Sequence, residues 1–222
     1  RTDGKVLAVM GYKEIKLELG HRPTRTEMYR TLGLDFFKLI RDGCLKYLAN
    51  QGNLNTEELG WLNSPVEDFL IYLEHTRFDK SYKIPTLLSF VTQENGLKPS
   101  VTLTEIAQSF IHFYCDYKTH QVDFCNKCHK DWHLWSVDQF ADLALRNPVT
   151  YLAESGSQFF RYDADRQVLS LDPCLEEYIK SRLLAEHVLD IMRFRELDYF
   201  DRRIPMKMKR WDAAAEAAAG YE

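Results

Sequence analysis

The side chains best suited to carry chemistry form a cysteine and histidine cluster near the middle of the chain. They are spaced as Cys115-x4-His120-x4-Cys125-x2-Cys128-His129-x3-His133. Thiolates and imidazoles at such spacings are ligands of tetrahedral zinc. The pattern predicts a zinc site with Cys125, Cys128 and His133 as three ligands and Cys115 or His120 as the fourth. The alternative is that these residues fall together by chance on an aromatic-rich turn.

Two other readings of the same cluster have less support. Cys125-Asn126-Lys127-Cys128-His129 matches the C-x-x-C-H attachment pattern of c-type haem, but no export signal opens the chain. A redox C-x-x-C motif needs a βαβ context, which is missing. The chain has five cysteines, an odd number, which argues against a secreted disulfide framework.

Recognised catalytic motifs are absent from the sequence. It contains no phosphate-binding glycine loop, no H-E-x-x-H and no G-x-S-x-G. Acidic pairs such as Glu57-Glu58 are most simply exposed helix faces. The sequence therefore predicts no catalytic constellation within this chain.

Basic side chains concentrate near the start of the chain. Residues 1–50 hold 10 Lys and Arg against 6 Asp and Glu, whereas residues 51–200 hold 14 against 23. Any face that binds phosphates is expected in the first third or in the basic stretch 202–210. The alternative for that stretch is a linker to a following domain.

These basic residues fall on a segment with the outline of a helix-turn-helix. Apolar residues at helical spacing predict a helix that ends at Gly20, and Thr24 with Glu27 predicts a capping box. A short helix then runs to Leu32, and Gly33 permits a tight turn before the next helix. The residues predicted to contact DNA are Arg22, Arg25, Arg30, Lys38 and Arg41. Ordinary helix packing is the alternative.

The sequence pattern after residue 50 predicts further helices and one β-hairpin. Ser64 before Pro65 marks a helix start, and Thr102 or Thr104 caps a later helix. Residues 159–162 and 167–171 read as two strands around a turn, followed by a long helix from Asp172-Pro173. Helix, short helix, hairpin and helix outline a winged-helix-like unit, and a structural clasp is the alternative.

The fold class expected is thus mostly α, with several helices and one small hairpin. The predicted domains are residues 1–50 (basic helical unit), 51–135 (helical middle with the Cys/His cluster), 136–203 (helix, hairpin and helix) and 204–222 (basic linker and Ala-rich tail). The chain is 45% hydrophobic, has a formal charge of −4, and lacks the ~18 consecutive apolar residues of a membrane helix. We expect a soluble, cytoplasmic protein without a membrane partner.

Three segments resemble an accessory region of bacterial DEAD/DEAH-box (superfamily 2) helicases, similar to those of modification-dependent restriction enzymes. They are residues 12–29 (YKEIKLELGHRPTRTEMY), 79–114 (beginning DKSYKIPTLLSFV and ending VTLTEIAQSFIHFY) and 143–163 (LALRNPVTYLAESGSQFFRYD). The resemblance implies a bacterial defence protein whose ATP-dependent motor, a hydrolase, lies elsewhere in the parent chain. The motor's ATP-binding motifs have no counterpart here.

Two functions follow as expectations. The first is a non-catalytic, nucleic-acid-associated accessory domain that guides or clamps DNA beside the helicase motor domain. The second is a structural or protein-interaction module without DNA contact, which zinc would stabilise if the cysteine cluster binds it.

Overall fold

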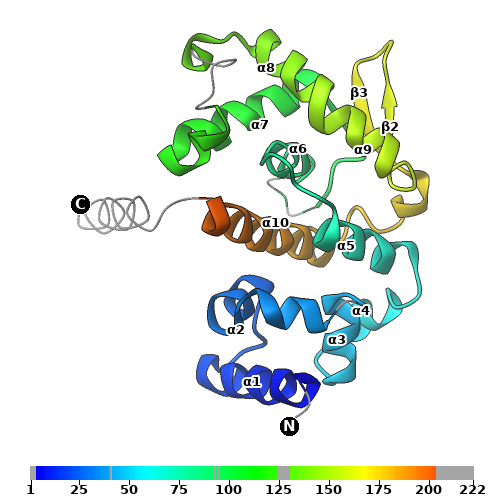
Figure 1. Ribbon diagram of the computed structural model, residues 1–222. Coiled ribbons are helices and arrows are strands. Elements are labelled where there is room, and N and C mark those ends of the chain that lie inside the picture. Colours follow the sequence, from blue (N-terminus) through cyan, green and yellow to red (C-terminus); the bar gives the residue numbers. More distant parts are fainter. Residues whose placement is uncertain (1–3, 41, 93, 95, 125–130, 204–222) are drawn as a thin grey trace. The chain divides into compact units, whose positions relative to one another are not determined.

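The chain folds into two units, each built from segments far apart in the sequence, as the computed structural model shows (Figure 1). The structure describes residues 4–40, 42–92, 94, 96–124 and 131–203, with side chains from residue 9 onward. Unit 1 comprises Arg1–Arg77, Val91–Leu97 and Asp172–Arg195, and unit 2 comprises Phe78–Phe90, Lys98–Leu171 and Glu196–Glu222. The units are therefore interleaved, unlike the consecutive blocks suggested by the sequence. The expected mostly helical fold with a small β element is confirmed.

Unit 1 is helical. Its elements are α1 (Gly4–Leu19), α2 (Arg25–Leu39), α3 (Cys44–Asn50), α4 (Thr56–Gly60), α5 (Pro65–His75), the 3-10 turn η5 (Pro173–Leu175) and the first part of α10 (Arg182–Arg203). None of the helices in the described part of the chain combines the length and apolar content that a bilayer crossing requires.

The predicted start and turn signals of unit 1 are confirmed. Thr24 and Glu27 form a reciprocal capping box at the start of α2. Gly33 has a φ of 73° inside α2, so the helix breaks there as the sequence indicates. Ser64 caps α5 by accepting a hydrogen bond from the Val66 amide.

An aromatic core fills unit 1. Phe37 of α2 stacks on Phe194 of α10 with ring centroids 4.2 Å apart. Tyr12 packs edge-on against Tyr47 at 5.4 Å. The buried members of this core are Tyr12, Met28, Phe36, Phe37, Ile40, Cys44, Leu48 and Phe194.

The long helix α10 begins later than the sequence analysis places it. A start at Asp172-Pro173 is wrong, because Pro173–Leu175 forms only a short 3-10 turn capped by the Asp172 side chain. The helix instead starts at Arg182, where the Ser181 hydroxyl accepts a hydrogen bond from the Leu184 amide at 3.1 Å. This contact is the one that an N-cap makes.

Unit 2 places three short strands against helices. Its elements are α6 (Lys83–Leu88), β1 (Ser100–Thr102), α7 (Leu103–Asp116), the 3-10 turns η1 (Lys118–Asp123) and η3 (Trp132–Leu134), α8 (Val137–Ala144), the π-helical turn η4 (Leu145–Val149), α9 (Thr150–Ser155), β2 (Phe160–Asp163), β3 (Val168–Leu171) and the end of α10.

The predicted hairpin is present and is joined by a third strand, β1, which the sequence analysis does not predict. β2 and β3 pair antiparallel, and β1 pairs with the other edge of β3, so that Ser100 lies opposite Ser170. The sheet order is β1-β3-β2. From α6 to β3 the order is helix (α6), strand (β1), helix (α7), the helical run α8-η4-α9 and the β2–β3 hairpin, with β3 paired to β1. This order resembles that of a winged helix. It starts before residue 136, where the sequence analysis begins the winged-helix-like unit, and it does not include the long helix α10.

Candidate functional site

Arg25, which the sequence analysis assigns to a DNA-binding surface, lies buried in a network of charged side chains in unit 1. Only 2% of the residue is exposed. Its Nε donates to Glu74 at 2.7 Å, and its Nη1 lies 3.0 Å from His187 Nδ1 and 3.3 Å from Asp190 Oδ2. A guanidinium in this position is not available to a DNA backbone.

Asp190 ties α10 to the start of α2. Its carboxylate accepts hydrogen bonds from the Arg25 and Thr26 amides at 2.8 and 3.3 Å and from the Thr26 hydroxyl at 3.2 Å. These amides belong to the first turn of α2, where the helix dipole favours a negative charge. The carboxylate therefore stabilises both the arginine and the helix end.

Glu58 is the second buried carboxylate of the network. It accepts hydrogen bonds from Arg22 Nη1 at 2.7 Å, His187 Nε2 at 2.8 Å and the Asn55 amide at 2.9 Å. Burial alone would raise the pKa of Glu58, but these hydrogen bonds outweigh it and lower the pKa to about 2. Glu58 is therefore ionised in the folded protein at neutral pH.

The contacts of His187 with Arg25 and Glu58 determine which ring nitrogen carries the proton. Arg25 has only N–H donors, so Nδ1 accepts, and Nε2 carries the proton that is donated to Glu58. Burial lowers the pKa of His187, aided by the charge of Arg25 and opposed by Glu58. The imidazole is therefore neutral and connects an arginine to a carboxylate.

Glu74 completes the network from α5. One of its oxygens accepts from Arg25, and the other accepts from the Cys44 amide at 3.0 Å, at the start of α3. Burial raises the pKa of the Cys44 thiol to about 12, so this cysteine is an inert core residue.

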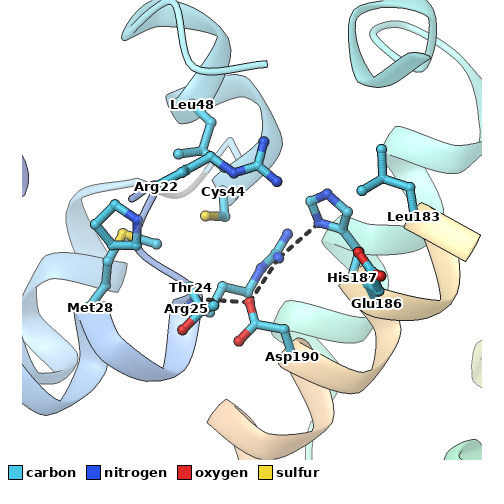
Figure 2. Close-up of a pocket in the computed structure, with 11 residues that line it drawn as sticks. Arg22, Thr24, Arg25, Met28, Cys44, Leu48, Leu183, Glu186, His187 and Asp190 are labelled. Atoms are coloured by element: carbon cyan, nitrogen blue, oxygen red, sulfur yellow. Dashed lines mark hydrogen bonds and ion pairs between the residues drawn. The ribbon is translucent and has the colours of Figure 1, made fainter. Parts of the chain in front are cut away.

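A cavity of about 130 Å³ adjoins the network (Figure 2). It is lined by Arg22, Pro23, Thr24, Arg25, Met28, Cys44, Leu48, Leu183, Glu186, His187 and Asp190. All of these residues belong to unit 1. The cavity therefore joins the beginning of the chain to α10.

The other basic residues predicted to contact DNA are dispersed. Arg22 is one-third exposed and paired with Glu58, Arg30 is exposed, and exposed Lys38 forms an ion pair with Asp35 at 2.7 Å. Arg41 lies outside the described residues. The structure thus brings Arg22 and Arg25 to one cavity and leaves Arg30 and Lys38 at the surface.

The structure describes only part of the predicted zinc site. Cys125 and Cys128 lie outside the described residues, whereas Cys115 and His133 are both exposed. In the described ranges, no group of three or more cysteine, histidine or acidic side chains is arranged to hold a metal ion. The zinc site stays a prediction.

His120, the alternative fourth ligand, has a structural environment. Its ring stacks on Phe113 and Phe200, with centroids 4.0 and 4.9 Å away. Its nitrogens lie 2.6 Å from the Phe113 carbonyl oxygen and 2.9 Å from Glu196. Both nitrogens therefore already have partners.

Unit 2 presents a second candidate surface, the exposed side of α8, η4 and α9. Buried residues of these elements, including Phe140, Leu143, Val149 and Leu152, hold the opposite side in the core. We call the exposed side together with the β2–β3 hairpin the helix–wing face. Its exposed residues include Asp138, Gln139, Asp142, Arg146, Tyr151, Glu154, Ser155, Arg161, Asp163, Asp165 and Arg166.

The helical part of this face is acidic. Asp138, Asp142 and Glu154 outnumber the one basic residue of the segment 137–155, Arg146. In the turn, the Arg166 guanidinium lies 3.8 Å from Asp163, so the charges of the wing largely offset one another. Tyr151 is 53% exposed and supplies a large aromatic surface.

Comparison with known protein families, curated proteins and solved structures finds no match to this chain.

The sequence analysis missed Glu74, His187 and Asp190, and it was wrong to place Glu58 on an exposed helix face, because this residue is 0% exposed. All four residues belong to the network. For two of these residues, the sequence contained a pattern that indicates burial. His187 lies within the apolar stripe of α10, and Glu74 directly follows the stripe of α5 at Leu73. A charged or polar residue on a core-facing position needs a partner, because burying it alone is costly.

Proposed function

We propose that this chain is a non-catalytic protein-interaction module that binds a partner protein through the helix–wing face of unit 2. The observation that carries the proposal is the acidic surface of α8 and α9. In a winged helix that binds DNA, the corresponding helix enters the major groove between two rows of phosphates. Asp138, Asp142 and Glu154 would be repelled there, whereas a basic protein segment complements them.

The aromatic side chain at this face also favours a protein partner. Tyr151 lies on α9 with half of its surface exposed. Tyrosine is among the residues that most often dominate the binding energy of protein interfaces. An exposed tyrosine on an acidic helical segment suits a basic partner that carries an apolar residue.

A charge-reversal pair tests this proposal. Asp138→Lys/Asp142→Lys changes two exposed residues four apart on α8, and Glu14→Lys/Glu18→Lys changes two exposed residues at the same spacing on α1. Both variants have the same net charge. A labelled lysine-rich peptide, followed by fluorescence anisotropy, is expected to bind the wild type and the α1 variant at low salt. The α8 variant is expected to lose this binding.

Equal loss in both variants would show that the peptide senses only net charge, and absence of peptide binding to the wild type would likewise contradict the proposal. Salt adds a second criterion, because exposed ion pairs weaken as ionic strength rises.

The second candidate is the DNA-associated accessory domain of a helicase-like protein, whose motor domain would lie in the same parent chain. The winged-helix element order favours it, as do Arg161 and Arg166 at the wing. Labelled duplex and single-stranded DNA in the same assay separate the two functions. DNA binding that is lost in Arg161→Ala/Arg166→Ala would support this candidate over the first.

A further inference from the structure

The cavity in unit 1 is lined by charged side chains of both signs. Arg22 and Arg25 line it from the segment that leads into α2, and Glu186 and Asp190 line it from α10, one helical turn apart. Figure 2 shows the two guanidiniums near His187, with a dashed line that joins Arg25 to Asp190. The cavity therefore offers both positive and negative groups to a ligand.

Arg25 has one donor without an acceptor. Its Nε and Nη1 are hydrogen-bonded, but within the described residues Nη2 has no hydrogen-bond partner, although the side chain is 98% buried. In Figure 2 the free end of this guanidinium is directed toward the space between Arg22, Cys44 and His187. A buried donor without an acceptor is costly, so an oxygen atom at this position would be stabilised.

A simple anion does not complement the whole cavity. Its carboxylate or oxyanion would satisfy the arginines, but it would also face Asp190 and Glu186. Glu186 has a 49% exposed side chain and uses Oε1 to pair with Arg182 at 2.8 Å. A ligand that adds a negative and a positive group together leaves the net charge of the cavity unchanged.

The volume of the cavity, which is partly open to solvent, suits a small molecule. A dry cavity of ~150 Å³ holds benzene, which has six heavy atoms. The present cavity measures about 130 Å³, so it suits a ligand of similar size. Met28, Leu48 and Leu183 form apolar parts of the lining, which suit a short aliphatic side chain.

We propose that this cavity binds a small zwitterion of the free α-amino acid class, with its carboxylate toward Arg22 and Arg25 and its ammonium group toward Glu186 and Asp190. This site is independent of the helix–wing face, because all of its residues belong to unit 1.

Titration calorimetry of the full chain tests the site with three probes: L-alanine, acetate and methylammonium. L-Alanine is expected to bind, whereas acetate and methylammonium, which each carry half of its charge pattern, are expected to bind far more weakly. Glu186→Gln is expected to weaken L-alanine binding about tenfold or more, since a charge-assisted contact is lost. Glu154→Gln makes the same substitution at an exposed glutamate of unit 2 and is the matched control.

Several outcomes would overturn the proposal. Acetate binding as tight as that of L-alanine would indicate an anion site only, and equal affinity in Glu186→Gln would remove the ammonium contact. Absence of L-alanine binding at millimolar concentrations would leave ordered water as the partner of Arg25. Because Glu186 is half exposed, its variant is expected to fold, which thermal unfolding without ligand verifies.

Discussion

Replacing Glu58 by glutamine tests whether the buried charge network stabilises unit 1. Glutamine keeps the size of the side chain but removes the negative charge. One of the two carboxylate oxygens, which accept hydrogen bonds in the wild type, is replaced by an NH₂ group that can only donate. Arg22 and His187 then compete for one oxygen. The loss is electrostatic, because the packing volume is almost unchanged.

The magnitude follows from the pKa of Glu58. Its value of about 2 in the folded protein, against 4.5 for an ordinary glutamate, corresponds to about 3 kcal/mol of stability at neutral pH. Breaking a buried ion pair by removing one partner costs a similar amount, ~3–5 kcal/mol. We therefore expect Glu58→Gln to reduce the free energy of unfolding by about 3 kcal/mol and the melting temperature by roughly 6–12 °C.

Urea denaturation monitored by tryptophan fluorescence measures this change, because one of the four indoles, Trp61, packs against His187 with ring centroids 5.6 Å apart. Circular dichroism of the same samples checks that helix content is unchanged. The matched control is Glu57→Gln, one residue away and exposed, which is expected to cost less than about 0.5 kcal/mol. A cost for Glu58→Gln below that level, or one equal to that of the control, would refute the reasoning.

pH adds a second signature to the same experiment. The folded-state pKa of Glu58 is lowered, so its contribution is fully present above pH 4.5 and is lost as the pH falls toward about 2. The stability difference between wild type and Glu58→Gln is therefore expected to shrink below pH 4.5. A difference that stays constant there would assign the effect to packing.

Three further outcomes are expected. Gly43→Ala should lower the free energy of unfolding by about 3 kcal/mol, because φ is +93° and the added Cβ would lie 2.6 Å from Ile71. Gly52→Ala, with open space around it, should lower it by only about 1 kcal/mol, and equal urea midpoints for the two variants would contradict this. Asp123→Asn should lower the stability of unit 2 by about 3 kcal/mol, because the buried carboxylate accepts hydrogen bonds from the Ser81 amide, the Ser81 hydroxyl and the Tyr199 hydroxyl. An unchanged urea midpoint would contradict this prediction. The pKa of His187 is lowered in the folded protein, so this imidazole is protonated more readily in the unfolded chain. Stability should therefore fall as the pH drops below about 6.5. His187→Gln should reduce that fall when unfolding is measured between about pH 7 and 5.

Local signals in the sequence predicted much of the fold. The capping pair Thr24 and Glu27, Ser64 and the break at Gly33 were predictable because each acts within a few residues of its own position. The hairpin was predictable from its alternating pattern. β1 was not, because a strand of three residues has too little pattern and is defined by its pairing with β3, some 70 residues later.

The charge network was beyond prediction for the same reason. Hydrophobic periodicity indicates which face of α2 or α10 is buried, but it does not tell which charged residues meet there. Arg25 and Asp190 are separated by 165 positions, so their pairing depends on tertiary packing. Arg25 follows a capping residue and resembles an exposed first-turn arginine, which explains why the sequence analysis placed it at a surface.

The interleaving of the two units bears on the order in which the chain can fold during synthesis. β3 is the central strand of the sheet, yet it is the last strand to be made. Unit 1 likewise lacks two of the three side-chain partners that Arg25 contacts in the described residues until His187 and Asp190 emerge, since only Glu74 is made early. Both units therefore have to wait for the C-terminal part of the chain, and a truncated product would expose charged and aromatic core residues to aggregation or proteolysis.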